Sequence, residues 1–154
     1  MIRLFREHDL RQEQSLDEVW DFAFLGDVTA DAVELSKIDF NDRMPVPGCF
    51  DATPNYAGKR GLVAYRTTTR LGESGHHRLI FEAVHHWCQV YVNRQLIREK
   101  SGGFTRFDVD FTGQPGKAEI IVLVDNRLDN GCSPLHLAYY DWYHYKLPWK
   151  WGLW

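Results

Sequence analysis

Trp20-Asp21-Phe22-Ala23-Phe24 places an aromatic side chain at every second position, with an acidic and a small residue between them. Because successive side chains of a β-strand point to opposite faces, this spacing puts the three aromatic rings on one face. Asp21 and Ala23 then lie on the other face, a pattern typical of a half-buried strand. We therefore expect this stretch to form a strand that buries its aromatic face in a core.

Further strand candidates follow at short intervals and are rich in β-branched and aromatic residues. They are residues 62–71, 78–84, 88–92, 96–99, 104–111 and 120–124. The last of them is a nearly continuous apolar run, as expected of a strand covered on both faces. Turn-forming Gly, Pro and Asn residues separate the candidates, at residues 44–48, 55–58, 93–95 and 102–103. This succession predicts an all-β sandwich or barrel, with a helical turn only around Asp31 and Glu34.

The composition agrees with one soluble domain. The chain has 154 residues, 44% hydrophobic and 25% charged, so it is able to bury a core and is not disordered. A net charge of −3 supplies no positive field to hold nucleic-acid phosphates. No stretch approaches the roughly 20 apolar residues that a membrane span requires. We therefore expect neither a nucleic acid nor a membrane as a partner.

The cysteines bear on the compartment. Cys49, Cys88 and Cys132 are odd in number and form no Cys-x-x-Cys pair, which favours free thiols in a reducing environment. The segment Met1–His8 becomes charged before an apolar stretch of signal-peptide length begins. Both observations predict a cytoplasmic location.

Two histidine pairs, His76-His77 and His85-His86, are the first candidates for chemistry. Adjacent strand residues point to opposite faces, so neither pair chelates a metal from one surface, and a metal site needs about three converging ligands. His76 and His77 follow a Gly-Glu-Ser-Gly stretch and are expected in a solvated hairpin loop. We expect no metal site and no cofactor.

Nucleophilic catalysis finds no support in the sequence. Cys88 lies in an apolar strand candidate, where a thiol is usually an inert small hydrophobe. Cys49 and Cys132 lie at turns without a sign of activation, and no Gly-x-Ser-x-Gly elbow occurs. Gly102-Gly103 is too short for a phosphate cradle and is not followed by a helical pattern. We therefore predict no catalytic residue in this chain.

The carboxylates form the last group of candidates. We interpret Glu82 as a strand carboxylate that hydrogen-bonds a neighbouring loop, and Asp108 and Asp110 as solvated or turn-anchoring residues on one strand face. Asp141 differs because it stands among aromatic residues, namely Tyr139, Tyr140, Trp142, Tyr143 and Tyr145. Aromatic faces stack on the C–H surfaces of sugars, and a carboxylate accepts hydrogen bonds from their hydroxyls. On composition alone, a rim carboxylate on an aromatic strand is the favoured interpretation.

Seven motifs in order resemble the N-terminal sugar-binding domain of glycoside hydrolase family 2, a family of β-galactosidases, β-glucuronidases and β-mannosidases. They are Leu16-Asp17-x-x-Trp20-x-Phe22, Val46-Pro47-Gly48-Cys49-Phe50, Asn55-Tyr56-Ala57-Gly58 with Ala64-Tyr65-Arg66, Phe81-Glu82-Ala83-Val84, Val90-Tyr91-Val92-Asn93, Gly102-Gly103-Phe104-Thr105-x-Phe107-x-x-Asp110, and Asp141-Trp142-Tyr143-His144-Tyr145. The likeness is greatest to β-glucuronidases and β-galactosidases. Residues 16–145 are covered, so the resemblance implies a galactose-binding-like jelly-roll β-sandwich over that range.

The resemblance also implies that catalysis lies elsewhere. In the family, the acid/base is the Glu of an Asn-Glu pair on a separate TIM barrel, which also carries the nucleophilic Glu. This sequence contains no Asn-Glu pair, and a barrel of about 250 residues does not fit in it. The chain is therefore expected to be the non-catalytic part of a retaining β-glycosidase, truncated or frame-altered from a longer gene product, with the barrel as its partner.

Substrate contacts follow from the same resemblance. The family's Asp that matches Asp141 hydrogen-bonds sugar hydroxyls, and Trp142 and Tyr143 would shape that loop around a β-glucuronide or a β-galactoside. Residues 1–15 are expected to be an N-terminal arm and residues 146–154 an atypical aromatic tail with three tryptophans. A stand-alone lectin-like module and a structural interaction domain are the alternatives. The sugar, its linkage and self-association into a homo-oligomer stay open.

Overall fold

The computed structural model describes residues 13–127, which form eight β-strands and four short 3-10 turns. The strands are β1 (Glu18–Gly26), β2 (Asp42–Val46), β3 (Leu62–Leu71), β4 (Gly75–Phe81), β5 (Trp87–Val92), β6 (Gln95–Ser101), β7 (Phe107–Gly113) and β8 (Gly116–Asp125). The 3-10 turns are η1 (Ala30–Ala32), η2 (Leu35–Lys37), η3 (Phe50–Ala52) and η4 (Pro54–Tyr56). No α-helix occurs in this part of the chain, and none of its helical segments is long and apolar enough to cross a membrane.

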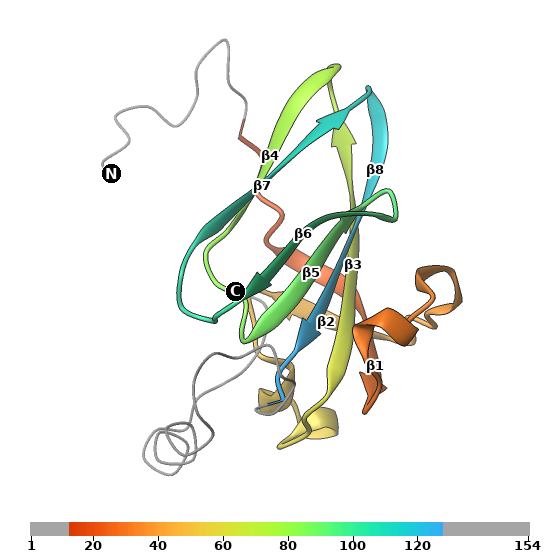
Figure 1. The fold of residues 1–154 in the computed structure, drawn as a ribbon, viewed down its shortest axis with the longest axis vertical. Helices are drawn as coiled ribbons and strands as arrows, with labels where there is room; N and C mark the ends of the chain where they lie inside the picture. The colour runs from red at the N-terminus through yellow and green to blue at the C-terminus, as the bar shows by residue number, and fades with distance from the viewer. Residues whose placement is uncertain (1–12, 128–154) are drawn as a thin grey trace.

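The strands form two antiparallel sheets that face each other (Figure 1). The larger sheet has the order β2-β1-β3-β8-β5-β6, and the smaller one pairs β4 with β7. Every pairing is antiparallel, and β3 and β8 stay in register over ten residue pairs at the centre of the large sheet. The all-β sandwich expected from the sequence is confirmed, and its sheet arrangement is consistent with a jelly roll.

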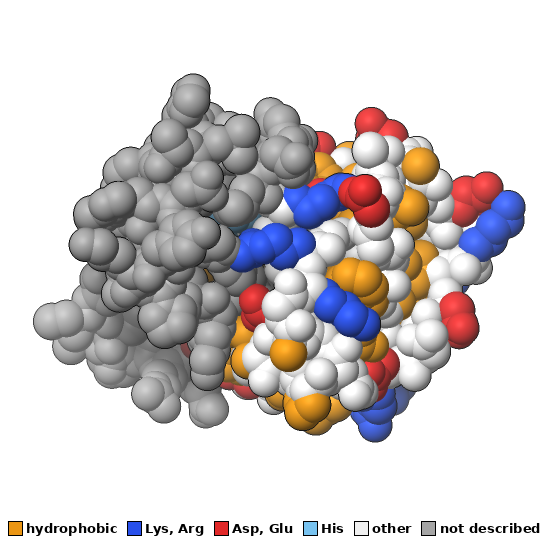
Figure 2. Space-filling model, turned by 90° about the horizontal axis from the view of Figure 1, so that it is seen from below, with side chains coloured by type: hydrophobic (Ala, Val, Ile, Leu, Met, Phe, Trp, Pro, Cys, Tyr) orange, Lys and Arg blue, Asp and Glu red, His pale blue; other side chains and the backbone are white. Residues whose placement is uncertain are grey.

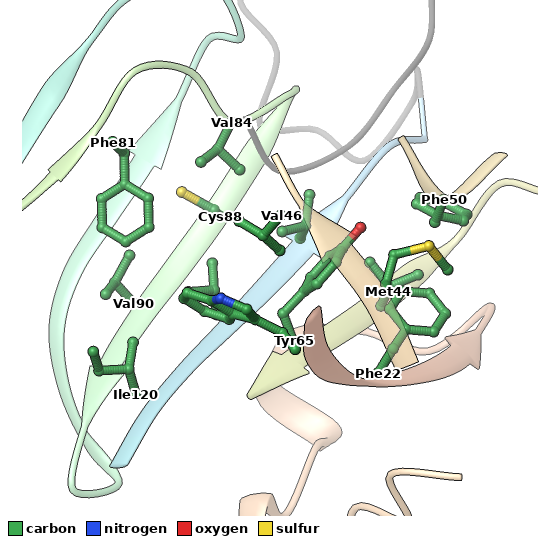
Figure 3. Close-up of a cluster of buried hydrophobic side chains, with 14 of the residues drawn as sticks. Phe22, Met44, Val46, Phe50, Tyr65, Phe81, Val84, Cys88, Val90 and Ile120 are labelled. Atoms are coloured by element: carbon green, nitrogen blue, oxygen red, sulfur yellow. The ribbon is translucent and has the colours of Figure 1, made fainter. Parts of the chain in front are cut away.

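The core lies between the two sheets, and aromatic cross-strand pairs contribute much of it (Figure 3). Phe22 on β1 lies opposite Tyr65 on β3, and their rings meet edge to face with centroids 5.1 Å apart. In the small sheet Phe81 and Phe107 lie opposite each other and stack at 4.9 Å. Such pairs add to the free energy gained by burying the rings themselves. The strand expected at Trp20 is confirmed, and its aromatic face points into this core.

A second apolar cluster covers the outer face of the large sheet. It consists of Ala23, Leu62, Ala64, Trp87, Ile121 and Leu123. The segment between β1 and β2 packs on this cluster with side chains that include Val33, Ile38 and Phe40. Strand β8 is therefore apolar on both faces, as its nearly continuous hydrophobic run predicted. The helical turn expected near Asp31 and Glu34 corresponds to η1 and η2.

Three boundaries differ from the sequence prediction. Residues 44–48 were expected to be a turn, but β2 runs from Asp42 to Val46 and pairs with β1. Pro45 is tolerated because β2 is an edge strand of the large sheet. Strand β4 begins at Gly75 rather than at residue 78, so His76 and His77 lie in a strand and not in a hairpin loop. Strand β7 begins at Phe107, three residues later than expected.

The hairpin between β5 and β6 follows the prediction closely. Its two loop residues, Asn93 and Arg94, both have positive φ values, 49° and 66°. A two-residue hairpin loop with positive φ at both positions matches the right-handed twist of the strands that it joins. The Asn93 side chain also accepts a hydrogen bond from the backbone N–H of Glu119 on β8.

Candidate functional site

The three residues predicted to contact a sugar, Asp141, Trp142 and Tyr143, lie outside the described residues, as do the tail 146–154, Cys132 and most of the arm 1–15. The structure does describe the end of the sandwich at which β8 finishes, and the chain continues from there toward position 141. There Ser101, Trp87, Asp125 and Leu62 form one cross-strand row over β6, β5, β8 and β3. We call this row, together with the loops beyond it, the β8 end.

Asn126, the first residue after β8, ties the β8 end to the loop before β3. Its side chain is fully buried and accepts a hydrogen bond from the backbone N–H of Gly61 at 2.8 Å. The same amide group donates to the carbonyl of Lys59 at 3.3 Å. The Arg60 guanidinium donates to the Asn126 carbonyl at 3.2 Å. The side chain of one residue therefore satisfies backbone groups that β3 leaves open, and it holds the exit of β8 in place.

Arg127 makes a second connection at this end. Its Nε and Nη2 atoms both donate to the Asp125 carboxylate, with distances from 2.6 to 3.1 Å. Nη1 forms an ion pair with Asp27, and Nη2 also donates to the Val28 carbonyl at 2.8 Å. Hydrogen bonding from Asp125 is the largest cause that raises the pKa of Arg127 above its ordinary value. The last described residue is thus held to β8 and to the loop after β1.

The pair His85-His86 lies in the loop that enters the β8 end from β4. Both side chains are buried, their ring centroids are 4.0 Å apart, and the peptide bond between them is cis. The His86 N–H donates to the Asp125 carbonyl, and the His86 carbonyl accepts from the Gly102 N–H at 2.7 Å. The loops after β4, β6 and β8 are therefore hydrogen-bonded to one another at this end.

Charged and apolar side chains share the exposed part of this surface. Figure 2 views the molecule from below, toward this end, and shows Lys and Arg side chains with hydrophobic ones between them. One such contact involves Lys59, whose ammonium group lies 5.4 Å and 5.1 Å from the ring centroids of Phe24 and Tyr56. These cation–π contacts hold a positive charge over an aromatic surface.

The other predicted candidates lie apart from this end or are inert. Burial raises the pKa of the Cys88 thiol to about 12, as expected for a small hydrophobe, and Cys49 is also buried. Asp110 pairs with Arg78 across the small sheet at 2.6 Å and is exposed. Glu82 follows β4 instead of lying in it, and it forms an ion pair with Arg106 at 3.6 Å. Among residues 13–127, no three His, Cys, Asp or Glu side chains converge in a way that would hold a metal ion.

His77 corrects the expectation of a solvated loop residue. Its ring stacks on Phe111 of the neighbouring strand β7, with centroids 5.4 Å apart. The Phe104 ring, by contrast, is exposed at the β8 end and was not predicted as a functional residue. The sequence motif that contains it, Gly102-Gly103-Phe104-Thr105, does not by itself distinguish an exposed ring from a core ring.

The fold of the described residues is shared with solved glycosidase structures. A β-glucuronidase from Faecalibacterium prausnitzii is 32% identical over 82% of this chain and superposes with a TM-score of 0.68. A GH2 β-galacturonidase from Eisenbergiella tayi is 29% identical over 83% of the chain, with a TM-score of 0.66. This chain resembles a domain of the family 2 glycoside hydrolases. A β-glucuronidase from Bifidobacterium dentium, 30% identical over 78% of the chain with a TM-score of 0.64, agrees with that resemblance.

The resemblance expected from the seven motifs is thereby confirmed at the level of structure. This chain spans only part of the length of those proteins, 23% of the F. prausnitzii chain and 22% of the E. tayi chain. No family model matches the sequence. A search of curated proteins also finds no match.

Proposed function

We propose that this chain is the N-terminal carbohydrate-binding β-sandwich of a family 2 β-glycosidase, and that it supplies one wall of a substrate pocket without taking part in bond cleavage. The observation that carries the proposal is the likeness of the sandwich to a β-glucuronidase that is 32% identical over 82% of this chain. The proposed ligand is a β-glucuronide or a β-galactoside.

The proposed sugar contact is Asp141. A carboxylate accepts hydrogen bonds from two neighbouring hydroxyls of a pyranose, and charge-assisted hydrogen bonds of this kind are stronger than neutral ones. Trp142 and Tyr143 would orient the loop that carries it. The connections made by Asn126 and Arg127 support this role, because they fix the point at which the chain leaves β8 on its way to Asp141.

In this proposal, both catalytic carboxylates belong to a TIM barrel that packs against this sandwich. A retaining glycosidase uses two carboxyl groups about 5 Å apart as acid/base and nucleophile. This sequence contains no Asn-Glu pair of the family's acid/base motif. The chain by itself is therefore expected to bind sugar and to leave the glycosidic bond intact.

Binding and hydrolysis assays on the 154-residue chain test this proposal. Titration with methyl β-glucuronide and methyl β-galactoside, followed by NMR, should show saturable binding to one of them in the millimolar range or tighter. Asp141→Asn should abolish that binding, whereas Asp39→Asn, at an exposed loop position, should not change it. Incubation with aryl β-glucuronides should release no phenol above background.

The alternatives give different results in the same experiments. A structural interaction domain would bind neither sugar, and Asp141→Asn would have no effect on any titration. Phenol release that survives repurification and depends on Asp141 or Glu82 would contradict a non-catalytic role. A stand-alone lectin-like module would bind sugar equally well but would not associate with a separately produced family 2 barrel.

A further inference from the structure

A hollow of about 260 Å³ lies on the large sheet, between β1, β2 and β3. Its wall is mostly polar and includes Glu18, Asp21, Arg43, Arg66 and Thr68. The volume is below the range of pockets that enclose drug-sized ligands, and it has room for a ligand about the size of one sugar residue. Because polar groups dominate the wall, the hollow suits a polar ligand.

One carboxylate in the hollow lies between two guanidinium groups. In the strand register, Asp21 on β1 is directly opposite both Arg43 on β2 and Arg66 on β3. Arg66 donates two hydrogen bonds to Asp21, at 3.1 and 2.8 Å, whereas the Nε atom of Arg43 is 4.0 Å from the other carboxylate oxygen. Asp21 therefore balances the charge of Arg66 and leaves most of the charge of Arg43 uncompensated.

Arg43 keeps most of its N–H groups available for a ligand. An arginine side chain has five N–H donors, and within residues 13–127 Arg43 donates a side-chain hydrogen bond to the carbonyl of Val19 alone, at 3.3 Å. Its side chain is 69% exposed. A planar guanidinium group binds a carboxylate through two parallel hydrogen bonds. The hollow therefore offers a binding group for a carboxylate.

The other polar groups of the hollow are already held in place. The Arg66 guanidinium lies 4.2 Å from the ring centroid of Phe40, and the Thr67 hydroxyl donates to the Glu18 carboxylate at 2.6 Å. A carboxylate has about four lone-pair sites, so Asp21 and Glu18 are able to accept further hydrogen bonds. The wall therefore combines donors for a carboxylate with acceptors for hydroxyl groups.

The face of the sheet that carries Arg66 continues with further cations. Arg70 on β3 and Lys117 on β8 are directly opposite each other, and both are exposed. Neither forms an ion pair with another of the described residues. Glu119, two residues along β8, is paired with Arg94 at 3.1 Å. Like charges in opposite positions of a sheet repel each other, so an anion bound nearby lowers the electrostatic energy of this face.

We propose that this hollow binds a uronate residue of an acidic oligosaccharide. The uronate carboxylate accepts hydrogen bonds from Arg43, and the sugar hydroxyls donate to the carboxylates of Asp21 and Glu18. Arg70 and Lys117 attract the negative charge of a neighbouring uronate in the same chain. This binding goes beyond the proposed function, because it takes place on a face of the large sheet and not at the β8 end.

The mixture of charges in the hollow distinguishes a uronate from other anions. A DNA strand presents phosphates without hydroxyl donors, so the carboxylates of Asp21 and Glu18 would repel it without gaining hydrogen bonds. A uronate carries one carboxylate and several hydroxyls on the same ring. It therefore matches both the donors and the acceptors of the wall.

NMR titration of the 154-residue chain with trigalacturonate tests this inference. Backbone amide signals from β1, β2 and the second half of β3 should shift, with saturation in the millimolar range. The neutral galactose trimer with the same linkage should leave these signals unchanged. Raising NaCl to about 0.5 M should weaken the binding of trigalacturonate, because salt screens exposed charges.

Variants of Arg43 locate the site. Arg43→Gln should weaken binding about fivefold, the upper end for one exposed charge pair. Arg43→Lys should not restore the affinity, because an ammonium group does not bind a carboxylate through two parallel hydrogen bonds. Arg98→Gln is the matched control, since Arg98 is exposed on β6, at the opposite edge of the large sheet from β2. It should leave the affinity unchanged, and all three variants should keep the wild-type unfolding midpoint in urea.

Equal affinity in Arg43→Gln and in the wild type would overturn the uronate site. A DNA oligonucleotide of the same charge that binds as tightly as trigalacturonate would also overturn it, because the face would then attract any anion. The proposed function has a separate readout: Asp141→Asn should abolish the binding of methyl β-glucuronide and leave the binding of trigalacturonate unchanged. Either proposal is therefore able to fail while the other stands.

Discussion

The backbone of Gly103 lies so close to the imidazole of His85 that a Cβ atom at position 103 would overlap the ring. The buried ring has little room to move, because it also lies 4.0 Å from the His86 ring, centroid to centroid. This contact explains in physical terms why the second glycine of Gly102-Gly103 stands where it does. It also leads to the first prediction.

Gly103→Ala should lower the free energy of unfolding by about 1–3 kcal/mol, the usual range for forcing extra atoms into a packed site. Gly72→Ala is the control, because a Cβ there would meet nothing within 4 Å, and surface changes of this kind usually stay within about 0.5 kcal/mol. Urea denaturation measures both. Equal midpoints for the two variants would show that the His85 loop moves aside without a loss of unfolding free energy.

Asn126→Ala should remove the hydrogen bond to the Gly61 N–H and leave that buried donor without its partner. The expected loss is about 1–3 kcal/mol of unfolding free energy, the cost of an unsatisfied buried polar group. Asn41→Ala, at an exposed position, should change the stability little. Thermal or urea unfolding distinguishes them, and a neutral Asn126→Ala would mean that water replaces the amide.

Cys88 should make the stability depend on pH in the alkaline range. Burial raises the pKa of its thiol from 9.0 to about 12, so the folded state keeps a proton that the unfolded state releases above about pH 9. The contribution is fully present below the unfolded pKa and is lost as the pH rises through the folded value, with a slope of up to about 1.4 kcal/mol per pH unit.

Unfolding free energies at pH 8 and at pH 10.5 measure this effect. The decline between them should be smaller in Cys88→Ala than in the wild type, whatever the absolute stability of the variant. Comparing the two declines removes the contribution of tyrosines, which titrate in both proteins. Identical declines would show that Cys88 ionises as easily in the folded state as in the unfolded one.

Asp110 should titrate at a lower pH than an ordinary aspartate. The Arg78 side chain donates two hydrogen bonds to its carboxylate, at 2.6 and 3.0 Å, and this is the largest cause that lowers its pKa. Its stabilising effect is present above the unfolded pKa and is lost as the pH falls through the folded value. Because the pair is exposed, the effect on stability should be small.

NMR titration of the Asp110 carboxyl carbon tests this assignment. Arg78→Ala should return the pKa toward the ordinary aspartate value, and so should added salt, which screens exposed charges. Arg70→Ala, which changes an arginine on β3, serves as the control and should leave the titration of Asp110 unchanged. A midpoint that does not move in Arg78→Ala would assign the shift to another group.

Local pattern was sufficient for most of the strands. Alternation at Trp20 and the apolar run at residues 120–124 predicted β1 and β8, because side-chain period and burial are coupled in a pleated strand. Strand β2 was missed because Pro45 within it and Pro47 just after it are typical of turns. Only the pairing of Met44 with Trp20 at a sheet edge makes such a strand favourable.

The sequence by itself determined the all-β class, the inward face of the strand at Trp20 and the likeness to family 2 glycosidases, since these depend on residues that are neighbours along the chain. Tertiary structure alone decided what meets at the β8 end: Asn126 with Gly61, Arg127 with Asp27, and Phe104 with His85. Those partners are separated by 19 to 100 residues, and no local spacing predicts contacts that form only when the strands pair and the loops between them converge.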